Sequence, residues 1–166
     1  MVVCELFDVV FGISGADNPV LRFEILTDLP AGTLVIYSVR RTYRDSHGGD
    51  CAWVGKSDKI AIAEGGKCHG RIEINESDAI AAGHFRQIDS GSSAPRISGL
   101  VSDTLELSFV VGARQRLREF GRKNSEFAGT LVANRGGINV LEVSHEIMLP
   151  MKSSLQPTSE SGMRDD

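Results

Sequence analysis

The chain has 166 residues, of which 41% are hydrophobic, and its formal net charge is −4. This length and apolar content suit one globular domain with its own core and exclude a largely disordered chain. The acidic balance argues against a protein that coats nucleic acid through its overall charge, and the lack of an 18-residue apolar run excludes a membrane-spanning helix.

The N-terminal residues 2–13 predict a first strand. Glu5 and Asp8 interrupt their apolar stretch and no basic region precedes it, so the stretch is a poor signal peptide. The three cysteines of the chain form an odd and sparse set, which is typical of free thiols in a reducing compartment. We therefore expect a cytoplasmic protein, provided that no leader was removed before this numbering.

The strongest pattern runs from Val20 to Tyr43, where two alternating apolar runs flank a cluster of turn residues at 28–32. In the first run every second residue is apolar, which predicts a strand that is buried on one face only. The second run is β-branched and aromatic on both faces and becomes cationic toward its end. The pattern predicts a β-hairpin whose second strand is central and leaves the core at its far end.

The remaining elements are also mostly strands. In chain order we expect a polar loop at 44–50, a strand at 51–54, a hairpin at 59–74 that turns at Gly65-Gly66, a helical turn at 78–85, a loop at 88–99, a strand at 103–111, and a last hairpin with strands at 127–133 and 138–149 around a turn at 134–137. Residues 112–123 break the alternation and predict a short helix or a long basic loop.

Together these elements predict an all-β protein. About eight or nine strands with a turn every eight to twelve residues are typical of an antiparallel β-sandwich or a partly open barrel, with at most one or two short helices. The lack of helices between strands excludes a doubly wound sheet. We expect a single β domain at 1–149 and a disordered polar tail at 150–166.

No catalytic motif is complete. Gly55-Lys56-Ser57 has the end of a phosphate-binding P-loop, but five residues rather than four separate it from Gly49, and the sequence that follows alternates as a strand instead of opening a helix. Ser46 and His47 are adjacent in sequence, which seldom produces the geometry of a catalytic triad. The sequence therefore favours a non-enzymatic protein and implies no cofactor, with zinc as the one candidate.

The zinc candidate consists of His47, Cys51, Cys68 and His69, whose thiolates and imidazoles suit a tetrahedral site. Neighbouring residues of a strand face opposite ways, so Cys68 and His69 could share one ion only across a bulge. Buried thiols and solvent-facing histidines explain the same residues without metal. If a site forms, the protein is a metal- or small-ligand-binding β-barrel or sandwich, with His84 as a spare ligand.

Two groups of cations offer a binding surface. The first, which we call the basic segment, contains Arg114, Arg116, Arg118, Arg122 and Lys123. When the negative charge of Glu119 is included, the local net charge of the segment is +4. On a helix, Arg114, Arg118 and Arg122 would share one face while Phe120 turned inward. The second group consists of Arg40, Arg41 and Arg44.

Such groups can recognise an acidic protein, a phosphorylated ligand or single-stranded nucleic acid. Nucleic acid is disfavoured by the acidic net charge and by the few aromatic residues near the cations. A solvated charged face with no partner is the alternative to all three. Our leading hypothesis is a non-enzymatic module that recognises another macromolecule, a protein, through the basic segment and the Arg40–Arg44 strand end.

Overall fold

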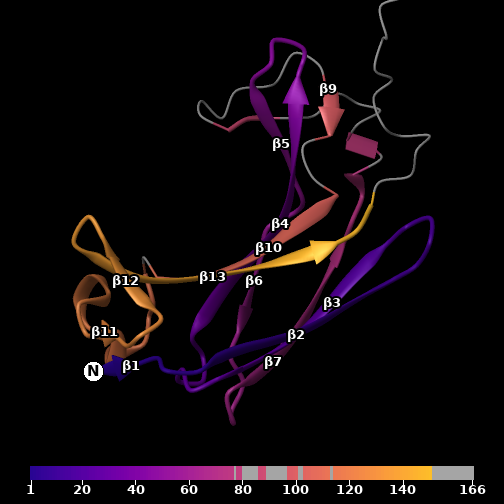
Figure 1. Ribbon diagram of the computed structural model, residues 1–166. Coiled ribbons are helices and arrows are strands. Elements are labelled where there is room, and N and C mark those ends of the chain that lie inside the picture. Colours follow the sequence, from indigo (N-terminus) through magenta and orange to yellow (C-terminus); the bar gives the residue numbers. More distant parts are fainter. Residues whose placement is uncertain (77, 80–85, 89–96, 101–102, 113, 151–166) are drawn as a thin grey trace, which may run out of the picture. The chain divides into compact units, whose positions relative to one another are not determined.

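The computed structural model describes residues 1–76, 78–79, 86–88, 97–100, 103–112 and 114–150 (Figure 1). Its strands are β1 (Val2–Val3), β2 (Phe7–Ser14), β3 (Val20–Thr27), β4 (Leu34–Asp45), β5 (Asp50–Val54), β6 (Asp58–Ala61), β7 (Lys67–Glu73), β8 (Arg86–Gln87), β9 (Ile97–Leu100), β10 (Thr104–Val111), β11 (Phe127–Ala128), β12 (Val132–Arg135) and β13 (Ile138–Met148). The predicted all-β sandwich is confirmed. The strands outnumber the expected eight or nine because β1, β8 and β11 have only two residues each, too few for alternation to show, and because β9 lies in a segment predicted as a loop.

The strands form three sheets. One has the order β2-β3-β7, and a larger one has the order β12-β13-β10-β4-β5-β8, with β6 and β9 also paired to β4. The third consists of β1 and β11, which pair in parallel. Figure 1 shows β2, β3 and β7 running side by side as one layer, in agreement with their continuous antiparallel registers.

The chain groups into two compact units. Unit 1 comprises Met1–Val39, Gly55–Ile74 and Leu107–His145, and unit 2 comprises Arg40–Val54, Asn75–Glu106 and Glu146–Asp166. Strands β4, β10 and β13 contribute residues to both units. We describe each unit by itself.

The core of unit 1 is built from aromatic side chains of both its larger sheets. The ring of Phe23 in β3 lies 4.8 Å from that of Tyr37 in β4 and 5.0 Å from that of Phe109 in β10, and Phe7 in β2 lies 5.8 Å from Phe109. In β3 buried and exposed residues alternate as predicted, with Leu21, Phe23 and Ile25 buried. Burial of these apolar side chains between two sheets is the main source of the unit's stability.

The predicted hairpin at Val20–Tyr43 is wrong, although both of its strands exist. β3 pairs with β2 and β7, whereas β4 pairs with β5, β6 and β9, so the two strands lie in different sheets. The turn residues at 28–33 carry the chain from one sheet to the other. There, the amide of Gly32 donates to the carbonyl of Ile62, which follows β6.

The hairpin predicted at 59–74 is wrong for the same reason, because β6 pairs with β4 and β7 with β3. Its turn at 62–66 crosses between the sheets beside the first crossing. The amide of Ile62 donates to the carbonyl of Thr33, and the amide of Thr27 donates to the carbonyl of Gly66. The two crossings thus satisfy one another's backbone groups, which a turn inside a sandwich otherwise leaves unpaired.

Other elements agree more closely with the sequence. The last hairpin is confirmed in part, with Val132–Arg135 paired to Ile138–Leu141 around Gly136-Gly137, whereas Phe127–Ala128 of its predicted first strand form β11 and pair with β1. The strands predicted at 51–54 and 103–111 are present as β5 and β10. The loop predicted at 88–99 instead contributes residues 97–99 to β9, which pairs with β4.

The remaining predictions fall partly outside the description. Of the helical turn predicted at 78–85, only 78–79 are described, and they are helical together with Glu76. Residues 151–166 of the predicted tail and His84 lie outside the described residues. Among the residues described, no helix has the length and apolar character needed to cross a membrane.

Candidate cationic binding site

The basic segment folds as two short 3-10 turns in unit 1. These are η1 (Arg118–Phe120) and η2 (Arg122–Asn124), separated by Gly121 at φ 64° and ψ −166°. Because this backbone conformation is not helical and favours glycine, one helix cannot run through the segment. The helical face that would have aligned Arg114, Arg118 and Arg122 is therefore not formed.

Aromatic packing holds the two turns in place. Phe120 is fully buried, as predicted, and its ring centroid lies 4.9 Å from that of the fully buried Phe127 in β11. The amide of Glu126 donates to the carbonyl of Phe120 and closes the loop between the two rings. The parallel pairing of β11 with β1 then ties the loop to the N-terminus of the chain.

A glutamine fixes the beginning of the basic segment. The side-chain oxygen of Gln115 accepts the amide of Leu34 at 2.9 Å, and its Nε2 donates to the carbonyl of Leu34 at 2.9 Å. The side chain thereby takes both backbone groups at the start of β4, as a neighbouring strand would. Arg114 and Arg116, on either side, are held at a defined position on unit 1.

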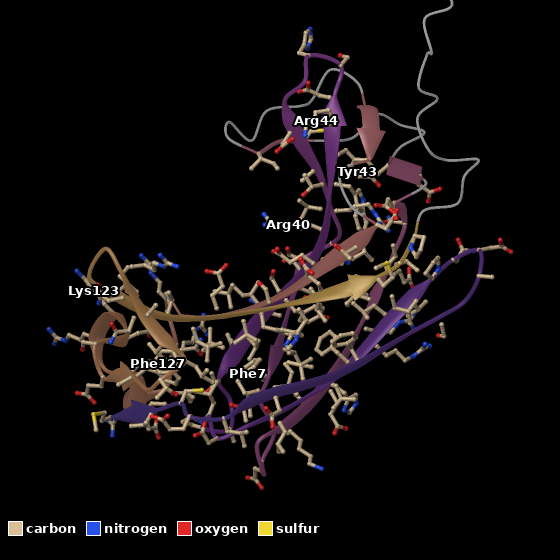
Figure 2. All side chains as sticks on the ribbon, in the orientation of Figure 1. Phe7, Arg40, Tyr43, Arg44, Lys123 and Phe127 are labelled. Atoms are coloured by element: carbon tan, nitrogen blue, oxygen red, sulfur yellow. The ribbon has the colours of Figure 1, made fainter. Side chains whose placement is uncertain are left out.

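All five cations of the basic segment are exposed. Within the part of the chain that the structure describes, none of them makes an ion pair. Their side chains extend from a backbone that the Phe120 and Gln115 contacts anchor to the rest of unit 1, and Figure 2 labels Lys123. An exposed cation without a carboxylate partner keeps its full charge for a ligand.

The second predicted group, Arg40, Arg41 and Arg44, does not form an exposed patch. Arg41 is only 1% exposed. Arg40 lies 3.1 Å from Glu106, and Arg44 lies 3.6 Å from Asp50, with about half of each arginine side chain accessible. The expected departure of this strand from the core is also wrong, because Tyr43 and Asp45 are buried.

Arg41 belongs instead to a buried polar cluster in unit 2. Its Nε lies 2.6 Å from Oε2 of Glu76, and its second guanidinium nitrogen donates to the carbonyl of Leu149 at 2.5 Å. The hydroxyl of Tyr43 donates to the same carboxylate oxygen. Burial, followed by this hydrogen bond, raises the pKa of Tyr43 above its ordinary value, so the phenol stays protonated.

A cavity of about 680 Å³ adjoins the basic segment in unit 1. It is lined by Arg114, Gln115, Lys123, Asn124, Gly136, Gly137 and Ile138. Residues 136–138 come from the β12–β13 hairpin, whose turn the sequence predicts without any indication that it lies beside the basic segment. Asn124 is also missed, because a single asparagine next to a basic run gives no signal of its own.

The zinc candidates are divided between the two units. The register between β3 and β7 is unbroken, so the bulge that Cys68 and His69 would need is absent, and Cys68 is buried whereas His69 is exposed. His47 and Cys51 lie in unit 2. No group of three or more potential metal ligands occurs among the residues described. Zinc binding stays a prediction without a described set of ligands.

The three thiols are free and buried. Burial, with a further contribution from the Asp28 carboxylate, raises the pKa of Cys4 to about 12. Burial also raises the pKa of Cys51 and Cys68, and Asp45 and Asp50 add to the shift at Cys51. Because the thiolate is the reactive form, these cysteines are poor nucleophiles near neutral pH.

Comparison of the chain with models of protein families, with curated proteins and with solved structures finds no match. The function must therefore be argued from the residues and their geometry.

Proposed function

We propose that this chain is a non-enzymatic binding module that recognises an acidic segment of another protein through the basic segment. The observation that carries this proposal is the state of its five cations, which are all exposed and have no ion-pair partner among the described residues. A fixed array of unpaired cations raises the association rate and the specificity for an anionic partner.

The second predicted group of cations offers less to such a partner. Arg40 and Arg44 are already paired with carboxylates, and Arg41 is buried, so we no longer include these three in the binding surface. The basic segment is also pre-positioned by the Phe120–Phe127 contact and by Gln115. Pre-positioning lowers the entropy lost when a partner binds.

The test compares two triple variants with the wild type in capture of proteins from a lysate of the source organism. One variant replaces Arg114, Arg118 and Arg122 by Ser. The control replaces three other exposed cations of unit 1, Lys56, Lys59 and Lys67, by Ser. Each variant loses three positive charges, so the net charge of both changes from −4 to −7.

We expect the arginine variant to lose a partner that the wild type and the lysine control both retain. Because all six side chains are exposed, neither variant should change the melting temperature by more than a few degrees. Equal capture by the wild type and the arginine variant would overturn the proposal. If the lost partner were nucleic acid rather than protein, a salt-dependent gel-shift assay would show it, and the proposed class of partner would be wrong.

A further inference from the structure

The cavity beside the basic segment is lined by two cations and two amide side chains, together with two glycines and Ile138. Arg114 and Lys123 contribute two positive charges, and none of the lining residues is acidic. The amide group of Gln115 is already hydrogen-bonded to the backbone of Leu34 through both its oxygen and its nitrogen. The cavity therefore has the electrostatic character of an anion site.

Asn124 provides a separate indication of a ligand. It is only 1% exposed, and its side-chain Nδ2 has no hydrogen-bond partner within the described part of the chain. A buried donor without a partner costs free energy, and such groups are rare in folded proteins. Asn124 lines the cavity beside Lys123, and we expect its amide to turn toward an acceptor that binds there.

The backbone around Asn124 is also unusual. Lys123 and Asn124 have φ values of 57° and 58°, in the left-handed region that residues other than glycine seldom adopt. This conformation places two consecutive polar residues, one charged and one amide, on the wall of one cavity. On the opposite hairpin, a Cβ at Gly136 or Gly137 would meet no atom within 4 Å, so the wall there is open.

We propose that this cavity binds a phosphoryl group. A phosphate monoester carries a charge close to −2 at neutral pH and presents three acceptor oxygens, which matches two cations and one unpaired amide. The cavity volume of about 680 Å³ exceeds what a lone phosphate fills, so the carrier of the phosphoryl group enters with it. The carrier is either a phosphorylated side chain of the partner protein or a small phosphorylated molecule.

This site goes beyond the proposed capture of a protein, because its test needs no partner. The ¹⁵N-labelled protein is titrated with phenyl phosphate at constant ionic strength, and the amide signals of Asn124 and Gly136 are followed by NMR. We expect saturable shifts of both signals and a weaker response to phenyl sulfate, which carries a single charge.

Two variants probe the site and one controls for charge. Asn124→Asp keeps the shape of the side chain, replaces the donor by a negative charge and suits a positive φ. Lys123→Gln removes an exposed cation and keeps the proposal testable if the buried substitution prevents folding. Lys59→Gln removes another exposed cation, which lies in β6, and serves as the control.

Removal of one charge-assisted hydrogen bond is expected to weaken phenyl phosphate binding by at least about tenfold in the first two variants, and the control should bind as the wild type does. No saturable shift at Asn124 and Gly136, or equal binding by Lys123→Gln and Lys59→Gln, would overturn the proposal.

The affinities of N-acetyl-O-phosphoserine amide and of a sugar phosphate are then compared. The ligand that binds more tightly identifies the carrier of the phosphoryl group, and either ranking of the two affinities supports the site. If the protein binds phenyl phosphate but captures no protein, this inference stands and the proposed function fails. If it captures a protein but does not bind phenyl phosphate, the proposed function stands and this inference fails.

Discussion

Replacing Glu76 by Gln should strongly destabilise unit 2. The Arg41 side chain is fully buried and that of Glu76 is 8% exposed, and the two are joined at 2.6 Å. Gln has nearly the same shape but no charge, so the variant removes the carboxylate charge that pairs with the buried guanidinium. Breaking a buried pair in this way costs about 3–5 kcal/mol.

This cost is a large fraction of the stability of an ordinary domain, which is about 5–15 kcal/mol. With a urea dependence of about 2 kcal/mol per molar, the unfolding midpoint should fall by roughly 2 M. The assay is fluorescence-monitored urea unfolding. Trp53 is the one tryptophan of the chain, is 3% exposed, and lies opposite Arg41 in the β4–β5 register, so its signal reports on the strands that carry the cluster.

Asp50→Asn is the matched control because it removes one negative charge from the same unit. Asp50 pairs with Arg44 at 3.6 Å, and about half of each side chain is exposed. Such surface pairs contribute about 0–1 kcal/mol, so the control should move the midpoint by less than about 0.5 M. If Glu76→Gln and Asp50→Asn shift the midpoint equally, the account of a buried charge cluster is refuted.

Three further predictions concern the crossings between sheets and the thiols. A Cβ at Gly66 would lie 2.0 Å from the carbonyl oxygen of Thr27, whereas one at Gly65 would meet nothing within 4 Å, and both residues have positive φ. Chemical unfolding should therefore show that Gly66→Ala costs about 3 kcal/mol and Gly65→Ala about 1 kcal/mol, and equal costs would contradict the close packing of the two crossings. For the thiols, iodoacetamide at pH 8 should modify the native protein slowly and all three cysteines quickly in denaturant. Because the pKa of Cys4 is raised from 9.0 to about 12, the folded state keeps between these pH values a proton that the unfolded state loses. The free energy of unfolding should therefore decline as the pH rises from about 9 toward 12. A free energy of unfolding that stays constant over this range would contradict the burial of Cys4.

The sequence patterns identify strands well but not their partners. Alternation in β3 and β10 follows directly from which face meets the core, and it is visible in the sequence. The cluster at 28–33 has the same proline and glycine whether the chain turns back within a sheet or crosses to another. That choice depends on the bonds between the Thr27–Thr33 and Ile62–Gly66 turns, which are distant in sequence.

The candidate site was predictable in part. The exposure of the basic segment and the burial of Phe120 follow from charge and apolar spacing. The burial of Arg41 does not, because its neutralising partner, Glu76, is 35 residues away and a cationic strand end ordinarily faces water. The cavity also depends on a distant element, since Gly136 and Gly137 reach it only through the pairing of β12 with β13.

The central claim is that the basic segment contacts a partner directly, and site-specific photo-crosslinking tests it most directly. A photo-crosslinking residue is placed at Ser125, beside Asn124, and in a second protein at Ser57. Both serines are exposed and both lie in unit 1. We predict that a protein partner is crosslinked from position 125 and not from position 57. Equal crosslinking from both positions, or none from position 125, would contradict the account.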